Sequence, residues 1–335
     1  MRIFIIIKIK IKIFWHLPCS YLLTNSYICS MLSYSVIGTG AIGGFYGSYL
    51  AKAGRQVRFL LHSDYDYVKN HGLRIDSCDG DFVLNKVDAY HSTSEMPTSD
   101  VVLVGLKSVN NHLLPDMLRP IINDDTIVVL IQNGIGLEED MQKLFPHLHI
   151  VAGLAFICSA KLGPGHISHQ CLGHINLGNY SAPQQDFVAL LKDMLDAGIQ
   201  AAEVPYLEAR WKKAVWNMPF NGMTVALNTS TDQLMKNPAT RQLIYEQMLE
   251  VIGAANALGV DALTADFADK MMQMTDEMVP YSPSMKLDFD FHRPMEIPYL
   301  YTRPIAEAKK VGFEMPKLAM LEAELLFIES RNEIK

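Results

Sequence analysis

A row of polar side chains runs through an otherwise apolar and aromatic segment, residues 207–228. Its members follow one another at intervals of three or four residues: Lys213, Asn217, Asn221, Thr224 and Asn228. This spacing places them on one face of a helix. Buried asparagine side chains cost free energy unless they form hydrogen bonds. A bound polar substrate would supply these bonds, and the alternative is hydrogen bonding between helices.

The lysine in this row is a candidate proton donor. A lysine that is partly removed from water has a lowered pKa and can act as a general acid near neutral pH. Such a donor is needed when hydride transfer to a carbonyl carbon leaves negative charge on the oxygen. Lys213 is therefore the candidate catalytic residue, and Asn217 and Asn221 are candidate contacts for the polar groups of a substrate.

A glycine-rich turn near residue 40 is typical of dinucleotide binding. It follows a short apolar run, precedes a helical stretch, and has the form Gly-x-Gly-x-x-Gly. Its first glycine allows a tight turn, its second lets the backbone approach a pyrophosphate, and its third lets the helix pack closely. The candidate cofactor-binding residues are those of the motif: Gly38, Thr39, Gly40, Ala41, Ile42 and Gly43.

The residues after the second predicted strand, 56–61, bear on the choice of cofactor. NAD-binding enzymes place a carboxylate there for the ribose 2′-hydroxyl, whereas NADP-binding enzymes avoid it. His62 and Ser63 could donate hydrogen bonds to a phosphate, but Asp64 is compatible with NAD. The sequence favours NADPH and leaves NADH open.

Two further apolar runs, 100–106 and 126–131, are typical of parallel strands that are covered on both faces. Polar residues follow each run at the edge where doubly wound sheets bind ligands, among them Lys107 and Asn133. Short alternating runs near residues 165–178 indicate two antiparallel strands. The predicted class is α/β, with a Rossmann doubly wound sheet domain.

From about residue 205 the pattern is helical to the end of the chain. We therefore predict a Rossmann domain over residues 31–204 and an all-helical C-terminal domain over residues 205–335 that carries the substrate and catalytic residues. Residues 1–30 differ from both, because three lysines interrupt the apolar stretch that a signal peptide or membrane helix needs. We expect this segment to be a non-native or disordered extension, with Met31 as the natural start.

Composition narrows the class of protein. The formal net charge of −7 argues against nonspecific binding to nucleic acid. Five scattered cysteines without a Cys-x-x-Cys motif indicate thiols in a reducing compartment, so we expect a cytoplasmic protein. Three clustered histidines suggest a metal, but such residues on a half-exposed hairpin are more often structural, and we predict no metal: His166, His169 and His174.

These residues together resemble the ketopantoate reductase (2-dehydropantoate 2-reductase) family over nearly all of residues 31–335. The resemblance rests on the glycine motif at 38–43, Leu106-Lys107, Gln132-Asn133-Gly134, the hairpin 165–178, Trp211-Lys212-Lys213 with Asn217 and Asn221, Ser284-Met285 with Asp288, and Arg293-Pro294-Met295-Glu296-Ile297. It implies reduction of ketopantoate to pantoate with NADPH, in pantothenate and coenzyme A biosynthesis.

The resemblance also implies roles for single residues. Lys213 would be the proton donor, and Asn217, Asn221 and Ser284 would contact the substrate. Asn133 would lie between nicotinamide and substrate, and Lys107 would be a cation on the cofactor side. Glu296 would hydrogen-bond the cofactor and help to order the site. These assignments make Lys213 and Glu296 the catalytic pair.

The sequence departs from the family at several points near the expected site, among them Thr231, Pro298 and Thr302. His62 stands where the family usually has arginine, and Tyr281 stands where a substrate-side asparagine is expected. Tyr301 replaces another family residue beside the site. These changes leave two alternatives, a reductase of another branched 2-oxo acid and a non-catalytic NADP-binding protein. An apolar helical face in the second domain would allow a homodimer.

Overall fold

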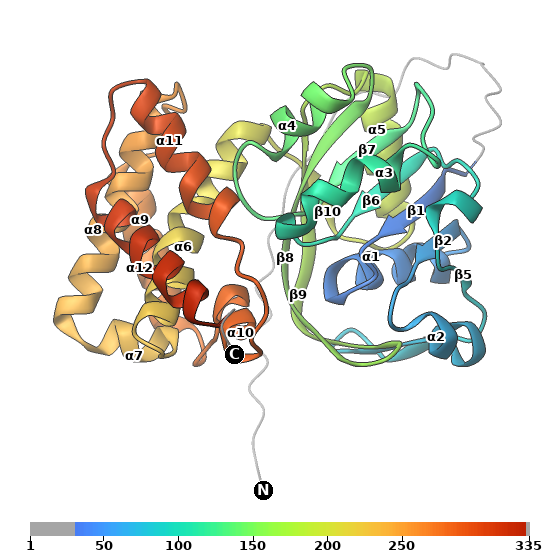
Figure 1. Cartoon of the computed structure of the whole chain (residues 1–335), viewed down its shortest axis with the longest axis horizontal. Helices are drawn as coiled ribbons and strands as arrows, with labels where there is room; N and C mark the ends of the chain where they lie inside the picture. Colours follow the sequence, from blue (N-terminus) through green and yellow to red (C-terminus); the bar gives the residue numbers. More distant parts are fainter. Residues whose placement is uncertain (1–30, 333–335) are drawn as a thin grey trace, which may run out of the picture. The chain divides into compact units, whose positions relative to one another are not determined.

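The computed structural model describes residues 31–332, which belong to one compact unit, Met31–Lys335 (Figure 1). The expected extension at residues 1–30 lies outside the described residues. Within residues 31–332, no helix is long and apolar enough to cross a membrane.

The first part of the described chain alternates strands with helices. Its elements are β1 (Ser33–Ile37), α1 (Ala41–Lys52), β2 (Gln56–Leu60), α2 (Tyr65–His71), β3 (Leu73–Ser77), β4 (Phe82–Leu84), β5 (Asp88–Tyr90), η1 (Thr93–Glu95), β6 (Val101–Val104), η2 (Ser108–Leu113), α3 (Leu114–Leu118), β7 (Ile127–Leu130), α4 (Leu137–Leu144), β8 (His149–Gly163), β9 (His166–Asn179), α5 (Gln184–Asp196) and β10 (Ala201–Glu203).

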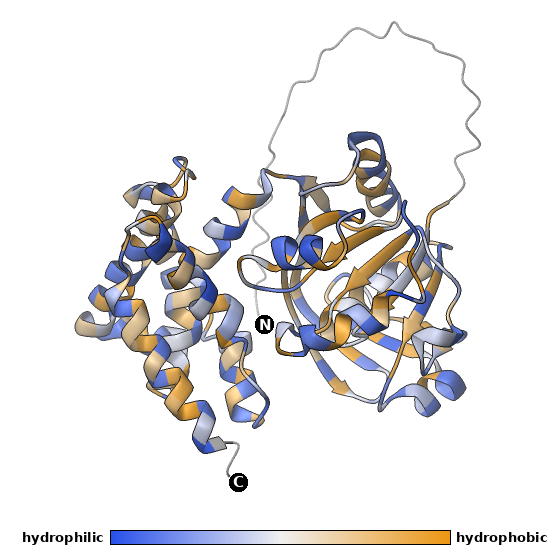
Figure 2. Cartoon of the chain, turned by 45° about the horizontal axis from the view of Figure 1, so that its top comes forward, coloured by the Kyte–Doolittle hydropathy of each residue, from blue (hydrophilic) through white to orange (hydrophobic). Residues whose placement is uncertain are grey.

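The strands form one sheet in the order β4-β3-β9-β8-β7-β6-β1-β2-β5, with β10 paired to β9. The pairs from β5 through β2, β1, β6 and β7 to β8 are all parallel. Strands β6 and β7 are buried along their whole length, which explains their continuous apolar sequence (Figure 2). This arrangement confirms the predicted α/β class with a Rossmann-like sheet.

The hairpin of β8 and β9 differs from the prediction. The runs expected to be two separate antiparallel strands are one strand, β9, which pairs with β8 from Asn179 to His166. The interruption between the runs is a local irregularity, where Leu172 and Gly173 take φ angles of 67° and 109°. Two turn-like residues can therefore be absorbed as a bulge in a long, twisted strand.

The second part of the described chain is helical. It contains α6 (Tyr206–Ala226), α7 (Thr231–Lys236), α8 (Pro238–Ala257), α9 (Ala265–Glu277), α10 (Ser284–Asp290), the π-helical turn η3 (Pro298–Thr302), α11 (Arg303–Lys310) and α12 (Pro316–Asn332). These helices share a hydrophobic core centred on α6, with Trp211, Phe220 and Tyr301 among its fully buried members. The structure thus has the predicted helical second part, while the exact domain limit at residues 204 and 205 stays a prediction.

Helix α6 is shorter than the polar row that was predicted on it. The helix ends at Ala226, and Asn228 lies beyond it with a φ of 47° and an exposed side chain. The Thr224 hydroxyl donates to the carbonyl of Phe220 in its own helix at 2.7 Å. The Thr224 hydroxyl is already used within the helix and Asn228 lies beyond the helix end, so the row on this helix face is limited to its first three members.

Candidate active site

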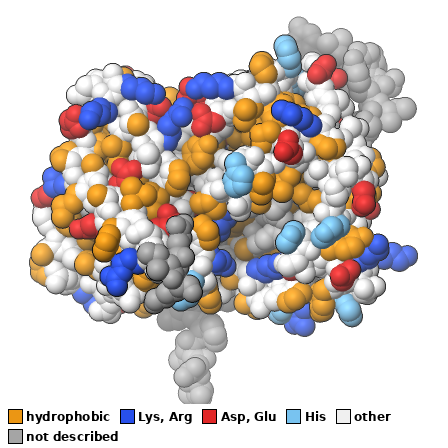
Figure 3. All heavy atoms as spheres, viewed as in Figure 1, with side chains coloured by type: hydrophobic (Ala, Val, Ile, Leu, Met, Phe, Trp, Pro, Cys, Tyr) orange, Lys and Arg blue, Asp and Glu red, His pale blue; other side chains and the backbone are white. Residues whose placement is uncertain are grey.

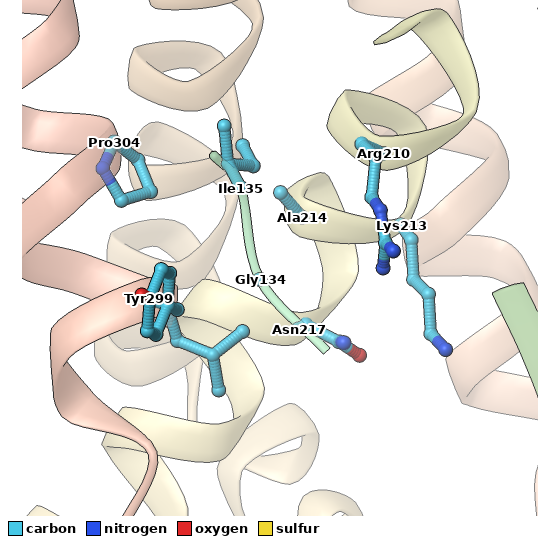
Figure 4. Close-up of a pocket in the computed structure, with 9 residues that line it drawn as sticks. Gly134, Ile135, Arg210, Lys213, Ala214, Asn217, Tyr299 and Pro304 are labelled. Carbon is cyan, nitrogen blue, oxygen red and sulfur yellow. The ribbon is translucent and has the colours of Figure 1, made fainter. Parts of the chain in front are cut away.

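A pocket lies where three segments of the described chain meet (Figure 4). The loop after β7 contributes Gly134 and Ile135, helix α6 contributes Arg210, Lys213, Ala214 and Asn217, and the region of η3 and α11 contributes Tyr299, Leu300 and Pro304. The parallel strand β7 ends at this pocket, as expected for a ligand site in a doubly wound sheet.

Lys213 projects from α6 toward strand β8. Its Nζ donates a hydrogen bond to the carbonyl oxygen of Ala155 at 2.7 Å and lies 5.2 Å from the centre of the Phe156 ring. Removal from water is the largest cause that lowers its pKa, and the positive charge of Arg210 acts in the same direction. The carboxylate of Glu296 opposes them, and the pKa of Lys213 falls to about 7. This lysine can therefore donate a proton near neutral pH.

The two asparagines of the row have different environments. The half-buried Asn217 lines the pocket with Lys213, one helical turn away (Figure 4). Asn221 is 2% exposed, and its amide donates to the carbonyl of Asn217 at 2.9 Å and accepts from the N–H of Met285 at 3.1 Å. Asn221 thus holds the N-terminus of α10, whereas Asn217 offers its amide to the pocket.

Ser284 is the first residue of α10, and it is exposed. The bond from Met285 to Asn221 fixes this helix start against α6. Ser284 is not among the residues that line the pocket. The structure therefore places Ser284 on a helix that is fixed against the helix of Lys213, but outside the pocket's lining.

The glycine turn has the geometry that a dinucleotide requires. A Cβ at Gly38, where φ is +84°, would lie 2.3 Å from the backbone nitrogen of Leu106, and one at Gly43 would lie 2.4 Å from the carbonyl oxygen of Gly38. At Gly40, by contrast, a Cβ would meet no atom within 4 Å. No side chain caps the first turn of α1. The open space beside Gly40 and the uncapped helix start fit a pyrophosphate.

The other residues of the motif serve the loop itself. The Thr39 hydroxyl donates to the carbonyl of Leu60 at 2.8 Å, which ties the turn to the end of β2. The carbonyl of Ala41 accepts a hydrogen bond from the Ser159 hydroxyl at 3.3 Å, and Ile42 packs against the core of the sheet. These residues can therefore contact a dinucleotide through their backbone while their side chains and carbonyls hold the turn.

In the segment after β2, the residues that favour NADPH and the residue that is compatible with NAD have different environments. His62 and Ser63 are exposed, and the His62 ring lies 6.1 Å from that of His91 in a stacked arrangement. Asp64 is buried and binds the Lys161 ammonium at 2.6 Å and the N–H of Gly165 at 2.9 Å. Burial disfavours its charged form, but the bonds from Lys161 and Gly165 outweigh burial and lower the pKa of Asp64.

Lys107 and Glu296 connect the strand ends to the segment around α10. Lys107, just after β6, forms an ion pair with the buried Asp288, which also binds Arg293 at 3.0 Å. Glu296 is 6% exposed, and its Oε1 accepts hydrogen bonds from the N–H and the hydroxyl of Ser108 at 3.0 and 2.8 Å. Both predicted residues thus link segments far apart in sequence at the rim of the predicted cofactor site.

Asn133 follows β7 between two anchored neighbours. The Gln132 amide donates to the carbonyl of Leu106 at 2.7 Å and to Asn111 at 2.6 Å, and Gly134 packs against Tyr299 so closely that a Cβ would lie 2.5 Å from it. Asn133 itself is half-buried, and no partner for its amide is found among residues 31–332. Its amide is therefore available to a ligand.

Sequence reasoning did not identify Arg210 and Glu138. Arg210 lines the pocket, and its buried guanidinium binds Glu138 at the start of α4 and the carbonyl oxygens of Leu130 and Gln132. Its signal in the sequence was the position three residues before Lys213, on the same helix face. Sequence spacing alone could not reveal its partners.

Tyr301 also differs from its predicted place. It is fully buried in the helical core, and its hydroxyl donates to the carbonyl of Met218. The neighbouring Tyr299 and Leu300 line the pocket instead. Tyr281 is partly buried, and its ring centre lies 6.3 Å from that of Trp216. The Trp216 indole N–H in turn donates to Thr275 on α9. Tyr301 therefore supports the helix from behind and does not shape the pocket.

One cluster of potential metal ligands occurs among the described residues, formed by Cys78, Asp79 and His169. The Cys78 sulfur lies 3.8 Å from Nδ1 and 3.9 Å from Nε2 of His169. Nδ1 also contacts the Ser77 hydroxyl at 2.9 Å. His169 also packs against the Phe45 ring, with the ring centres 4.6 Å apart, and the absence of a metal stays a prediction.

Charged side chains of both signs are interspersed on the face that Figure 3 shows outside its grey atoms. They do not gather there into a basic surface of the kind that binds nucleic acid. This distribution agrees with the overall negative charge of the chain.

Comparison with known proteins gives matches along almost the whole described chain. The family model described as "Ketopantoate reductase PanE/ApbA" matches residues 34–182, and its C-terminal counterpart matches residues 206–329. A 2-dehydropantoate 2-reductase from a Nostoc species is 42% identical over 306 residues, which cover 89% of this chain and 96% of that protein.

Solved structures give the same result. The crystal structure of 2-dehydropantoate 2-reductase from Geobacter metallireducens has a TM-score of 0.84 at 35% identity and covers 88% of this chain and 99% of that one. The corresponding enzyme from Methylococcus capsulatus has a TM-score of 0.83 at 33% identity and covers 90% and 98%. The similarity therefore extends over both the sheet and the helical part.

Proposed function

Because this chain belongs to the ketopantoate reductase family, we propose that it is an NADP-dependent 2-dehydropantoate 2-reductase, which reduces 2-dehydropantoate to pantoate in pantothenate and coenzyme A biosynthesis. The observation that carries the proposal concerns Lys213, which has a pKa of about 7. Lys213 lines a pocket together with Asn217 and the loop residues that follow Asn133. A 2-oxo acid needs such a proton donor at its carbonyl oxygen.

NADPH would be held by the glycine turn 38–43 and the residues after β2, and when bound it supplies the hydride for the carbonyl carbon. The backbone around Gly40 leaves the space for a pyrophosphate, and the first turn of α1 offers its N–H groups. Lys107, whose side chain is 38% exposed, lies on this side of the site with its ammonium paired to Asp288.

Lys213 would carry the acid catalysis. Its ammonium donates a proton to the carbonyl oxygen of the substrate as negative charge develops there, and solvent then returns a proton to the amine. Ala155 accepts a hydrogen bond from the same nitrogen and so orients it. Glu296 opposes the loss of the proton from Lys213 and, through Ser108, keeps the start of η2 in place beside the site.

Substrate contacts would come from side chains on both sides of the pocket. Asn217 lines the pocket from α6, and Asn133 lies in the loop after β7, next to the lining residue Gly134. Both amides are available for the carboxylate and hydroxyl groups of a 2-oxo acid. Ser284, exposed at the start of α10, would bind the substrate carboxylate. Asn221 would act indirectly, because its amide is used to position α10.

The preference for NADPH over NADH is supported by the two bonds of Asp64. A carboxylate that binds Lys161 and Gly165 is not free to receive a ribose 2′-hydroxyl. The exposed His62 remains as a donor for a 2′-phosphate, whereas the Ser63 hydroxyl donates to Asp64 at 3.1 Å. The expected cytoplasmic location and homodimer stay predictions.

An assay of NADPH oxidation over a panel of 2-oxo acids, run in parallel with NADH, tests the proposal. We expect the highest kcat/KM for 2-dehydropantoate with NADPH. A higher value for another branched 2-oxo acid would identify a related reductase with a different substrate. Binding of NADPH without oxidation by any member of the panel would indicate a non-catalytic protein.

A further inference from the structure

Arg210 occupies a fully enclosed position near the start of α6. Its Nη2 donates to the carbonyl oxygen of Leu130 at 3.0 Å, its Nη1 donates to the carbonyl of Gln132, and its Nε lies 3.1 Å from the carboxylate of Glu138. The side chains of Arg210 and Glu138 are 2% and 1% exposed. A buried guanidinium in this setting tolerates little movement, because leaving any one partner would expose an unpaired charge to a low-dielectric environment.

These bonds join the parts of the site that carry the reacting groups. Leu130 is the last residue of β7, and Asn133 comes three residues later in the loop. Lys213 comes three residues after Arg210 on α6, and the two side chains lie next to each other in the pocket (Figure 4). One guanidinium therefore fixes the distance between the strand end and the helix face.

We propose that Arg210, held by Glu138, is a positioning residue for the reduction, which fixes Lys213 relative to the loop that carries Asn133 and places a permanent positive charge beside the ammonium. The proposal rests on the proposed function. It assigns Arg210 no contact with the reacting atoms.

The charged groups that face Lys213 determine how this arrangement acts on its proton. Arg210 lies on the same helix, Glu296 precedes η3, and His174 lies on β9. Strand β8 contributes the Ala155 carbonyl and the Phe156 ring. Arg210 lowers the pKa of Lys213, and Glu138 partly neutralises Arg210. Removing Arg210 should therefore raise the pKa of Lys213, and neutralising Glu138 should lower it.

Two variants separate this role from simple loss of packing. Arg210→Met with Glu138→Gln removes the pair without leaving a buried carboxylate unpaired, and Glu138→Gln alone leaves the arginine charge without its counterion. The ionisation of Lys213 is followed by the pH dependence of its acetylation by acetic anhydride, mapped by mass spectrometry against the exposed Lys236. We expect the midpoint to rise by about half a pH unit or more in the double variant and to fall in Glu138→Gln.

Activity gives the second readout. In the double variant kcat should fall by about tenfold or more, because the loop and the helix lose their fixed separation, while NADPH binding should change by less than about threefold. Arg210→Lys keeps the positive charge but loses the planar guanidinium that binds several acceptors at once. It should therefore lower kcat while the pH midpoint of Lys213 acetylation changes little. If the double variant does not fold, Arg210→Lys and Glu138→Gln decide the question.

The control is Arg241→Met with Asp276→Asn, which removes an ion pair between α8 and α9 whose side chains are 40% and 43% exposed. It should leave the labelling midpoint and kcat unchanged. An unmoved Lys213 midpoint in both the double variant and Glu138→Gln, or a shift in the same direction in both, overturns the proposal. Because labelling needs no substrate, absence of 2-oxo acid reduction by the wild type would refute the proposed function separately.

Discussion

Glu296 accepts two hydrogen bonds from Ser108, one from its N–H at 3.0 Å and one from its hydroxyl at 2.8 Å, across 188 residues of sequence. Ser108 begins η2, four residues after the end of β6, and Glu296 lies two residues before η3. One buried carboxylate thus connects the sheet edge with the segment behind the pocket. The same carboxylate is one of the charges that set the pKa of Lys213.

Glu296→Gln should shift the activity of the enzyme to lower pH. The amide keeps an oxygen that can accept from Ser108, but the negative charge that raises the pKa of Lys213 is lost. The alkaline limb of kcat for reduction should therefore move to lower pH, and kcat near pH 7 should fall by about tenfold or more. The measurement is kcat against pH for the variant and the wild type.

The matched control is Glu277→Gln, a change at an exposed glutamate near the end of α9. It should leave the profile unchanged. If kcat of Glu296→Gln falls but the midpoint of its pH dependence stays unchanged, Glu296 acts only by holding the start of η2 in place.

Lys213→Ala should reduce turnover by about a hundredfold or more, since it removes the proton donor. NADPH binding should change little, because the glycine turn and the residues after β2 are untouched. In the wild type, reduction should be full below pH 7 and decline as pH rises through about 7, since the protonated amine is the active form. Near-normal turnover of Lys213→Ala, or a wild-type profile without this decline, would contradict the proposed acid.

The polar row on α6 shows how far the sequence could be interpreted. The intervals between Lys213, Asn217 and Asn221 suffice to place them on one helix face, and the first two line the pocket. The same periodicity continued to Asn228, but the helix ends at Ala226, because the end depends on contacts and not on spacing. Local periodicity therefore predicts a helix face better than a helix end.

Arg210 shows which contacts could not be predicted from the sequence. Its partners Glu138 and Leu130 are 72 and 80 residues away, and no local pattern relates such distant positions. The case of Asp64 is similar. Its residue type and position suit an NAD site, and only the tertiary structure shows that its carboxylate already binds Lys161 and Gly165. Residue type and position could be predicted, but whether a polar group is already paired could not.

His62→Arg should improve the use of NADPH selectively. An arginine can bind a phosphate through two parallel hydrogen bonds, which a histidine cannot. His62 is exposed, so the larger side chain should not disturb the core. We expect KM for NADPH to fall about threefold or more, with little change for NADH. His147→Arg, an exposed change after α4, serves as the control for added charge, and an equal gain in both variants would refute a specific contact.

The two glycines at 38 and 40 should respond differently to alanine. A Cβ at Gly38 would collide with the backbone at Leu106, at a φ of +84°, so Gly38→Ala should lower the free energy of unfolding by about 2 kcal/mol or more. Gly40 has a φ of −93° and open space around its Cβ position, so Gly40→Ala should fold with an almost unchanged Tm.

The open space beside Gly40 is the space that a pyrophosphate would take. Gly40→Ala should therefore weaken NADPH binding by about tenfold or more, although its fold is intact, because the added methyl keeps the phosphate from the backbone. Thermal unfolding followed by circular dichroism and NADPH titration followed by fluorescence distinguish the two glycines. Binding of NADPH by Gly40→Ala with wild-type affinity would show that the pyrophosphate lies elsewhere, since only a group in close contact with this backbone would sense one methyl.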